Sequence, residues 1–276
     1  MKKQALLVGI NDYNGVNDLQ GCINDVTNVR SVLKTFFGLE NTDIRVLTDS
    51  RATKENILSR LEKMVKNAAT GDYLIFHFSG HGSQIRDREG DELTDHMDEL
   101  ICPCDMNWDD GFITDDMISE ILQQLKKGVR MEILLDSCHS GTGTRDIRPF
   151  LTADQFQANP VHYRYLKPPA DIECRHLGDE ETLKPSKSFR TNKEITLNHI
   201  LWAGCKDSQT SADALIDGNY NGAFSYYFCK HVRESSGNIS RADLHTRVKN
   251  SLKFNHFNQV PQLECREALR SENIFK

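Results

Sequence analysis

Short apolar runs and longer amphipathic segments alternate along the first half of the chain. Two compact apolar runs, at residues 5–10 and 44–47, are typical of buried strands. Two more lie within residues 72–82 and 130–141 and continue into glycine-containing turns, and residues 99–105 form a weaker candidate. The pattern therefore predicts a series of short buried strands.

Between these runs, apolar residues recur at the spacing of one helix face. The stripes are Val26, Val29, Val32, Leu33 and Phe36; Ile57, Leu58, Leu61, Met64, Val65 and Ala68; and Ile118, Ile121, Leu122 and Leu125. Thr53 begins the second helix, and Thr114 suits the N-cap of the third, with Asp115 and Asp116 in its first turn. Such alternation predicts an α/β fold with a central, mostly parallel sheet and helices on both faces.

The pattern stops in the middle of the chain and then resumes. Residues 142–195 show no sustained periodicity and hold five of the seven prolines. A further strand is expected at residues 195–205, then a helix containing Phe224 and Phe228, and another helix from Ser240. We therefore expect three parts. A large region spans residues 1–141, an exposed connector 142–195, and a smaller region 196–276 that completes the same sheet.

The composition is that of an ordinary globular protein and argues against several functional classes. The 276 residues are 38% hydrophobic and 27% charged, with a formal net charge of -6, so bulk electrostatics would not hold a nucleic acid. No run approaches the roughly 20 apolar residues of a membrane helix, and the run before Gly9 is too short for a secretory signal. We expect a cytoplasmic monomer without a membrane or nucleic-acid partner.

The eight cysteines are irregularly spaced, which fits reduced thiols better than a disulfide framework. Cys102 and Cys104 form the one close pair. A lone Cys-x-Cys without a matching second pair is weak evidence for zinc.

Reactive side chains follow two of the expected strands. One strand continues into Ser-Gly-His-Gly, which contains His81, and another into Asp-Ser-Cys-His-Ser-Gly, which contains Cys138. If these strands are neighbours, both side chains lie at the same edge of the sheet, where an imidazole can take the proton of a nucleophilic thiol. Glycine in the turn leaves backbone N–H groups free to bind an oxyanion. The alternatives are a small buried cysteine and a simple His-Gly turn.

The segments HFSGHGSQ and LLDSCHSG together resemble the catalytic signatures of the metacaspases, in the caspase-like clan of cysteine peptidases. The resemblance continues through ALLVGINDY, LQGCINDV, DELICPCD, GFITDD, AGCKDSQTSADA and NGAFSYYF. It implies a caspase-like fold and a cysteine endopeptidase, with His81 as general base and acid and Cys138 as nucleophile. The backbone N–H groups of Gly82 and Cys138 are the expected oxyanion hole. The Gln-Ala-Cys-x-Gly sequence typical of true caspases is absent.

The resemblance also implies a preference for the residue before the cleaved bond. Metacaspases place acidic side chains in the primary pocket and cut after arginine or lysine, whereas caspases cut after aspartate. The family pattern maps onto Asp25, Ser79 and Asp136, and Asp136 lies two residues before Cys138, on the same face of the strand end. A pair of carboxylates accepts a guanidinium in bidentate fashion. Asp25 taken alone also fits an ordinary helix-start residue.

An acidic stretch runs from Asp87 to Asp116. Its spacing is not that of an EF-hand, because Gly111 falls one position late. Many metacaspases need calcium, and the family's ligand positions resemble Asp98, Asp115 and Asp116, with Asp146 as the nearest candidate for a fourth ligand. A solvated acidic face is the alternative.

The connector offers such an enzyme its nearest substrates. Its basic residues are Arg145, Arg148, Arg164, Lys167, Arg175, Lys184, Lys187, Arg190 and Lys193. Exposed aperiodic segments are where nicking concentrates, and tethering raises their effective concentration to the millimolar scale. We therefore expect self-cleavage within the connector.

Two other functions fit the sequence. One is a catalytically inactive caspase-like scaffold, against which the retention of His81, Cys138 and the pocket acids argues. The other is a proteolytic effector of bacterial defence or cell death, switched on by a partner or a signal molecule. Nothing in the sequence separates that effector from a stand-alone peptidase that acts on proteins or peptides.

Overall fold

A six-stranded sheet forms the centre of the computed structural model, which describes residues 1–13, 17–86, 97–138, 161–174 and 199–276. Its strands are β1 (Lys3–Gly9), β2 (Ile44–Thr48), β3 (Tyr73–Ser79), β7 (Arg130–Asp136), β9 (His199–Ala203) and β12 (Gln262–Glu264). They are ordered β12-β9-β7-β3-β1-β2, and only β12 runs antiparallel to its neighbour. The α/β class with a mostly parallel sheet is confirmed.

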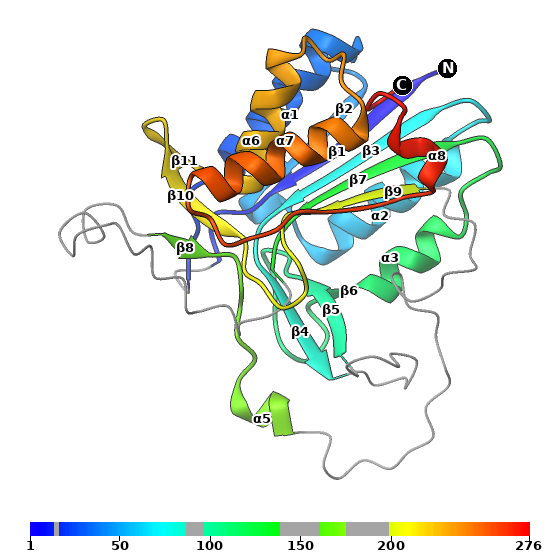
Figure 1. The fold of residues 1–276 in the computed structure, drawn as a ribbon. Helices are drawn as coiled ribbons and strands as arrows, with labels where there is room; N and C mark the ends of the chain where they lie inside the picture. The colour runs from blue at the N-terminus through cyan, green and yellow to red at the C-terminus, as the bar shows by residue number, and fades with distance from the viewer. Residues whose placement is uncertain (14–16, 87–96, 139–160, 175–198) are drawn as a thin grey trace.

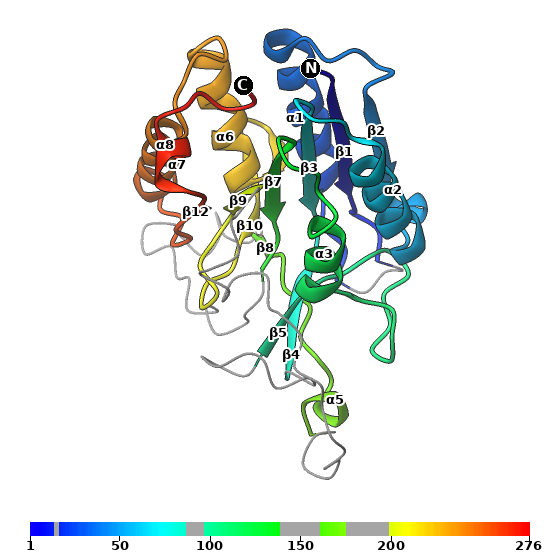
Figure 2. The same ribbon diagram turned by 90° about the vertical axis from the view of Figure 1, so that its right-hand side faces the viewer.

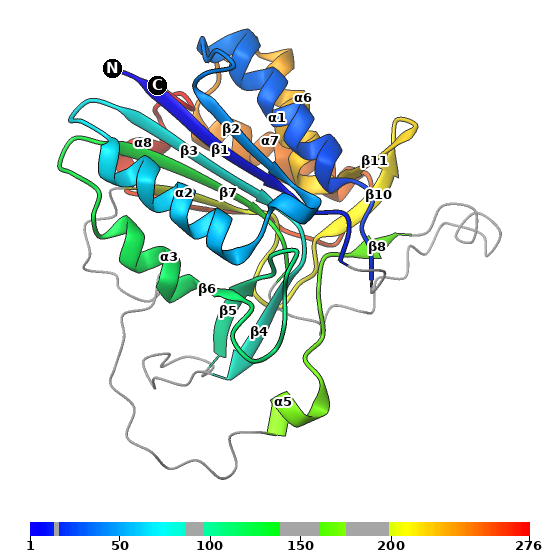
Figure 3. The same cartoon turned by 180° about the vertical axis from the view of Figure 1, so that it is seen from behind.

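Helices cover both faces of this sheet (Figures 1 and 3). One face carries α1 (Cys22–Phe37), α6 (Ala223–Glu234) and α7 (Arg241–Phe254), and the other carries α2 (Lys54–Asn67) and α3 (Asp115–Leu122). Short helical turns lie at η1 (Asp49–Arg51) and α8 (Glu267–Arg270). The Thr53 and Thr114 side chains accept backbone N–H groups at the starts of α2 and α3, as their sequences predict.

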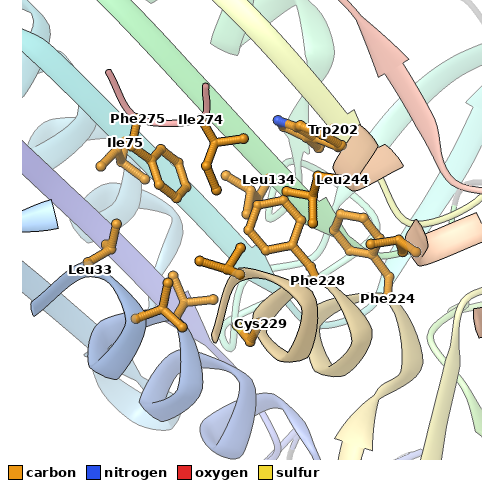
Figure 4. Packing of buried hydrophobic residues seen from close by; sticks show 14 of the residues in the cluster. Leu33, Ile75, Leu134, Trp202, Phe224, Phe228, Cys229, Leu244, Ile274 and Phe275 are labelled. Atoms are coloured by element: carbon orange, nitrogen blue, oxygen red, sulfur yellow. The ribbon is translucent and has the colours of Figure 1, made fainter. Parts of the chain in front are cut away.

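Two apolar cores explain why the central strands are hydrophobic at nearly every position. Ile75 on β3 packs in the core under α1 and α6, beside Phe275 and in the same cluster as Phe228 (Figure 4). Leu74 and Phe76, its neighbours in the strand, face the opposite core under α2 and α3. A strand covered on both faces buries successive side chains, so it shows a continuous apolar run rather than alternation.

One charged residue interrupts the apolar run of β7. Glu132 is fully buried and accepts hydrogen bonds from Trp202 Nε1 at 2.7 Å and from Arg241 Nε at 3.1 Å. Its carboxylate also accepts the backbone N–H of Phe275. Because its partners come from β9, α7 and the C-terminal segment, this buried ion pair connects the later parts of the chain to the sheet.

Two small antiparallel sheets lie beyond the carboxyl ends of β3 and β7. Of their strands, the sequence pattern indicated only the weaker candidate at residues 99–105, which overlaps the strand Met97–Ile101. One contains β4 (Gly82–Arg86), β5 (Met97–Ile101) and β6 (Ile113–Thr114), and the other contains β8 (His162–Tyr163), β10 (Ala212–Ile216) and β11 (Asn219–Gly222). Figure 2 shows β4 and β5 extending from the end of β3. Strands this short carry too few residues for a recognisable alternation.

The described part of the expected connector, residues 161–174, is only partly exposed. This part contains β8 and the short helix α5 (Ala170–Cys174). Arg164 is fully buried and Ile172 is 4% exposed. The strand expected from residue 195 begins at His199 in the structure, and residues 175–198 lie outside the described part of the chain.

Candidate active site

The two strand ends that carry reactive groups are neighbours. β3 and β7 pair in parallel register with Ser79 beside Asp136, so the residues that follow lie at one edge. Gly82 approaches the other turn so closely that a Cβ there would lie 2.2 Å from the Cys138 carbonyl oxygen. Only glycine allows this approach, which brings the backbone N–H groups of Gly82 and Cys138 together.

The ring of His81 is buried and held at one nitrogen. Its Nε2 lies 2.6 Å from the Asn17 carbonyl oxygen, which can only accept, so Nε2 carries the proton. Among the described residues, Nδ1 has no hydrogen-bond partner. Burial lowers the pKa of His81, although the carbonyls of Asn17 and Arg164 act in the opposite direction. The lowered pKa favours the neutral imidazole, in which Nδ1 is the unprotonated nitrogen.

Cys138 is buried directly after β7. The backbone N–H of Ser211 points at its Sγ, and the thiol lies 3.4 Å from the Ser211 carbonyl oxygen. Ser211 immediately precedes β10, so the smaller C-terminal region fixes the position of the sulfur.

The three expected pocket residues converge on a side chain from the connector. The guanidinium of Arg164 donates to Asp25 Oδ2 at 2.7 Å and to Ser79 Oγ at 2.8 Å, and it lies 3.3 Å from Asp136 Oδ2. Ser79 Oγ in turn donates to Asp25 Oδ2 at 2.7 Å. Although Asp25 lies in the first turn of α1, its carboxylate faces this pocket and accepts the backbone N–H of Gly222.

Three pocket residues escaped the sequence analysis. Asp213 Oδ1 lies 3.3 Å from the guanidinium, and Ser211 Oγ donates to Asp136 Oδ1 at 2.5 Å. At Gly222 a Cβ would lie 2.3 Å from Asp136 Oδ2 and 2.5 Å from Arg164 Nη1, so any side chain would fill the pocket. Asp213 and Ser211 lie in the segment AGCKDSQTSADA. This segment is part of the resemblance to the metacaspases, but the resemblance assigned no role to either residue.

The charges of the pocket favour a cation. Burial raises the pKa of Asp25 to about 7, although the adjacent Arg164 acts in the opposite direction. Burial also opposes the charge of Arg164, but the carboxylates of Asp136, Asp25 and Asp213 outweigh it and hold the pKa of the guanidinium above its usual value. Three buried carboxylates around one guanidinium make a site complementary to an arginine side chain.

The backbone around Arg164 is held on both sides. Its carbonyl oxygen accepts the N–H groups of Gly82 at 2.9 Å and Cys138 at 3.2 Å, and its own N–H donates to Ser211 O at 3.1 Å. Before it, β8 pairs with β10; after it, the Leu166 N–H donates to Gly82 O at 2.9 Å. The connector thus crosses the site as an extended strand, with the Arg164 carbonyl at the expected oxyanion hole.

Comparison with known proteins assigns the family. A model described as "Metacaspase, peptidase C14 domain" matches residues 3–145. Metacaspase-1 of Pyricularia oryzae is 33% identical over 99% of this chain and 74% of its own length. The chain belongs to the metacaspase family. Metacaspase-1 of Botryotinia fuckeliana is 34% identical, over 99% of this chain and 70% of its own length.

Solved structures agree on the fold. A Geobacter sulfurreducens protein superposes with a TM-score of 0.69 at 23% identity, covering 100% of this chain and 99% of its own. Caspase-1 of Spodoptera frugiperda gives 0.59 at 12% identity, over 96% of this chain and 86% of its own. The metacaspase therefore has a caspase-like fold, and its family is one of cysteine-type peptidases. No helix in the described part of the chain is long and apolar enough to cross a membrane.

The acids that the resemblance assigns to calcium are only partly described. Asp98 lies on β5, and the pairing of Leu100 with Thr114 brings this strand to the start of α3, where Asp115 and Asp116 lie. Among the described residues of the metacaspase, no three acidic, histidine or cysteine side chains gather into a metal site. Asp146 lies outside the described residues. The expectation of a calcium site therefore stays a prediction.

Proposed function

We propose that this metacaspase hydrolyses peptide bonds after arginine or lysine through a Cys138–His81 dyad. The observation that carries the proposal is the position of Arg164. Its guanidinium lies among the carboxylates of Asp25, Asp136 and Asp213, and its carbonyl oxygen accepts two backbone N–H groups. A basic residue is thereby held as a peptidase holds the residue before the cleaved bond.

The proposed chemistry has two steps. His81 Nδ1 takes the thiol proton, and Cys138 Sγ attacks the carbonyl carbon of the basic residue. The Gly82 and Cys138 N–H groups stabilise the oxyanion, and the intermediate collapses to a thioester as His81 gives the proton to the leaving amine. A water molecule, deprotonated by His81, then cleaves the thioester, releasing the new carboxylate and restoring the thiol.

The pocket supports a preference for arginine over lysine. A planar guanidinium reaches Asp25, Ser79 and Asp136 simultaneously, as Arg164 does. A lysine ammonium is a point charge and satisfies fewer of these acceptors at once. An aspartate would bring a further negative charge into a buried acidic pocket.

The same geometry supports self-processing at one bond. Of the basic residues in the connector, Arg164 occupies the pocket, so we propose the Arg164–Tyr165 bond as the first substrate. The products are residues 1–164 and 165–276. They stay associated because β9 and β12 of the second fragment belong to the same sheet as β7 of the first.

A panel of fluorogenic peptides tests the specificity. Peptides ending in Arg should be cleaved fastest, those ending in Lys more slowly, and those ending in Asp not measurably. Cys138→Ala protein is the control and should cleave none. Efficient hydrolysis after Asp would contradict the pocket assignment.

We also propose that calcium stimulates the enzyme. The support is chemical, because Asp98, Asp115 and Asp116 offer hard oxygen donors at one end of the β4–β5–β6 sheet. Calcium at about millimolar concentration, typical of weak sites, should raise the cleavage rate of Arg peptides, and excess chelator should lower it. Full activity in chelator, unchanged on adding calcium, would make the acidic stretch a solvated face.

A reducing compartment such as the cytoplasm fits the proposed chemistry. Seven of the eight cysteines, those whose side chains the structure describes, are free thiols. A nucleophilic cysteine must stay reduced to act, and disulfides are rare in the cytosol. We therefore propose that the enzyme works there.

A further inference from the structure

The connector is also anchored after Arg164, outside the pocket and the oxyanion hole. Two apolar side chains, Leu166 and Ile172, provide the anchors. They lie two and eight positions beyond the basic residue.

Leu166 is held by both its backbone and its side chain. Its N–H donates to Gly82 O at 2.9 Å, and its carbonyl oxygen accepts the Ser83 hydroxyl at 2.6 Å. The side chain packs against the core under α2 and α3. Ser83 is fully buried on β4, so its hydroxyl is a fixed donor for the main-chain carbonyl of the second residue after the cleaved bond.

Ile172 lies on α5 and fills a separate small cluster. It is 4% exposed and packs with Ile85 of β4, Leu100 of β5 and Phe112 before β6. These are the remaining buried members of that cluster, so Ile172 covers the apolar side chains of the small sheet. The residues between the anchors include Pro168 and Pro169, which restrict the backbone and reduce the entropy lost when both anchors bind.

We propose that the β4–β5–β6 sheet is a second recognition surface, which selects substrates by the residues after the cleaved bond. It takes an aliphatic residue two positions after the basic residue and a second aliphatic residue eight positions after it. The inference rests on the proposed cleavage after arginine. The occupant seen in the structure is the chain's own Tyr165–Ile172 segment.

Substitutions placed in a substrate peptide test this surface and leave the fold of the enzyme unchanged. The parent peptide has the sequence of residues 161–174, with Ala in place of Cys174. Replacing its leucine or its isoleucine by Asp should each lower kcat/KM about tenfold, since part of the burial of a large aliphatic side chain is lost. The connector of the enzyme competes with every peptide equally, so it leaves the ratios unchanged.

Matched controls alter exposed neighbours in the same peptide. Replacing the lysine that corresponds to Lys167, or the aspartate that corresponds to Asp171, by Ala should leave kcat/KM within twofold, because both side chains are exposed in the structure. Equal kcat/KM for the parent and both Asp-substituted peptides would overturn the second surface. If neither these peptides nor short Arg peptides are cut, the proposed function itself fails.

Substitutions in the full chain should change the cleavage rates of two substrates in opposite directions. Leu166→Asp and Ile172→Asp should slow self-cleavage at Arg164–Tyr165 about tenfold. They should also speed hydrolysis of a short fluorogenic Arg substrate, because the connector then occupies the pocket less. Self-cleavage at the wild-type rate in both variants would contradict the anchors.

Discussion

Arg164→Ala protein should remain a single chain where the wild-type protein is recovered as two fragments, the second beginning at Tyr165. The alanine has no group to place among Asp25, Asp136 and Asp213, which hold the guanidinium in the structure. The main-chain contacts with Ser211 and Gly82 remain, but the side-chain contacts that fix the residue before the bond in the pocket are lost. Arg164→Ala should therefore abolish cleavage of the bond before Tyr165.

Denaturing electrophoresis with intact-mass measurement over a time course detects the cut. Cys138→Ala should stay intact, whereas Lys167→Ala, which alters a neighbouring exposed basic residue, should be cut like the wild type. Arg164→Lys should be cut more slowly. Equal nicking of Cys138→Ala would assign the cut to another protease, and cleavage of the wild type only at a different basic residue would refute the Arg164 assignment.

Asp136→Asn should lower kcat/KM for arginine substrates by about a hundredfold to a few thousandfold. Asparagine has nearly the shape of aspartate, but it removes one of the carboxylates that face the guanidinium at 3.3 Å. Breaking a buried ion pair by neutralising one partner costs about 3–5 kcal/mol, and each 1.4 kcal/mol is a factor of ten. Because Asp136 also accepts the Ser225 backbone N–H, alanine would disturb the site more than asparagine.

Asp217→Asn is the matched control for this charge change. Asp217 lies exposed at the turn between β10 and β11, on the same hairpin as Asp213 but away from the guanidinium contacts. It should keep kcat/KM within about twofold of the wild type. Thermal unfolding of both variants checks that the fold is intact. Wild-type activity of Asp136→Asn towards arginine peptides would remove Asp136 from the pocket.

The sequence by itself determined the features that depend on neighbours along the chain. Periodicity predicted the strands and helices of the central layers, because a covered sheet buries successive side chains and a surface helix buries one face. At His81 and Cys138, the reactive side chain and the neighbouring glycines lie within a few residues of a strand end, so the local sequence was enough to indicate a catalytic role. Since consecutive parallel strands end at one edge, the two groups could be predicted to meet there, as the pairing of Ser79 with Asp136 now describes.

Only the tertiary structure decided which distant residues complete the pocket. Asp213 and Ser211 reach Arg164 and Cys138 from the start of β10, more than 40 residues further along the chain, through short strands that leave no periodic signal. The connector likewise contains nine basic residues, and no local sequence pattern shows which of them places its side chain in the pocket. Arg164 is distinguished by a buried cluster of carboxylates from α1, β7 and β10, and a charge is buried only where the whole fold assembles its counter-charges.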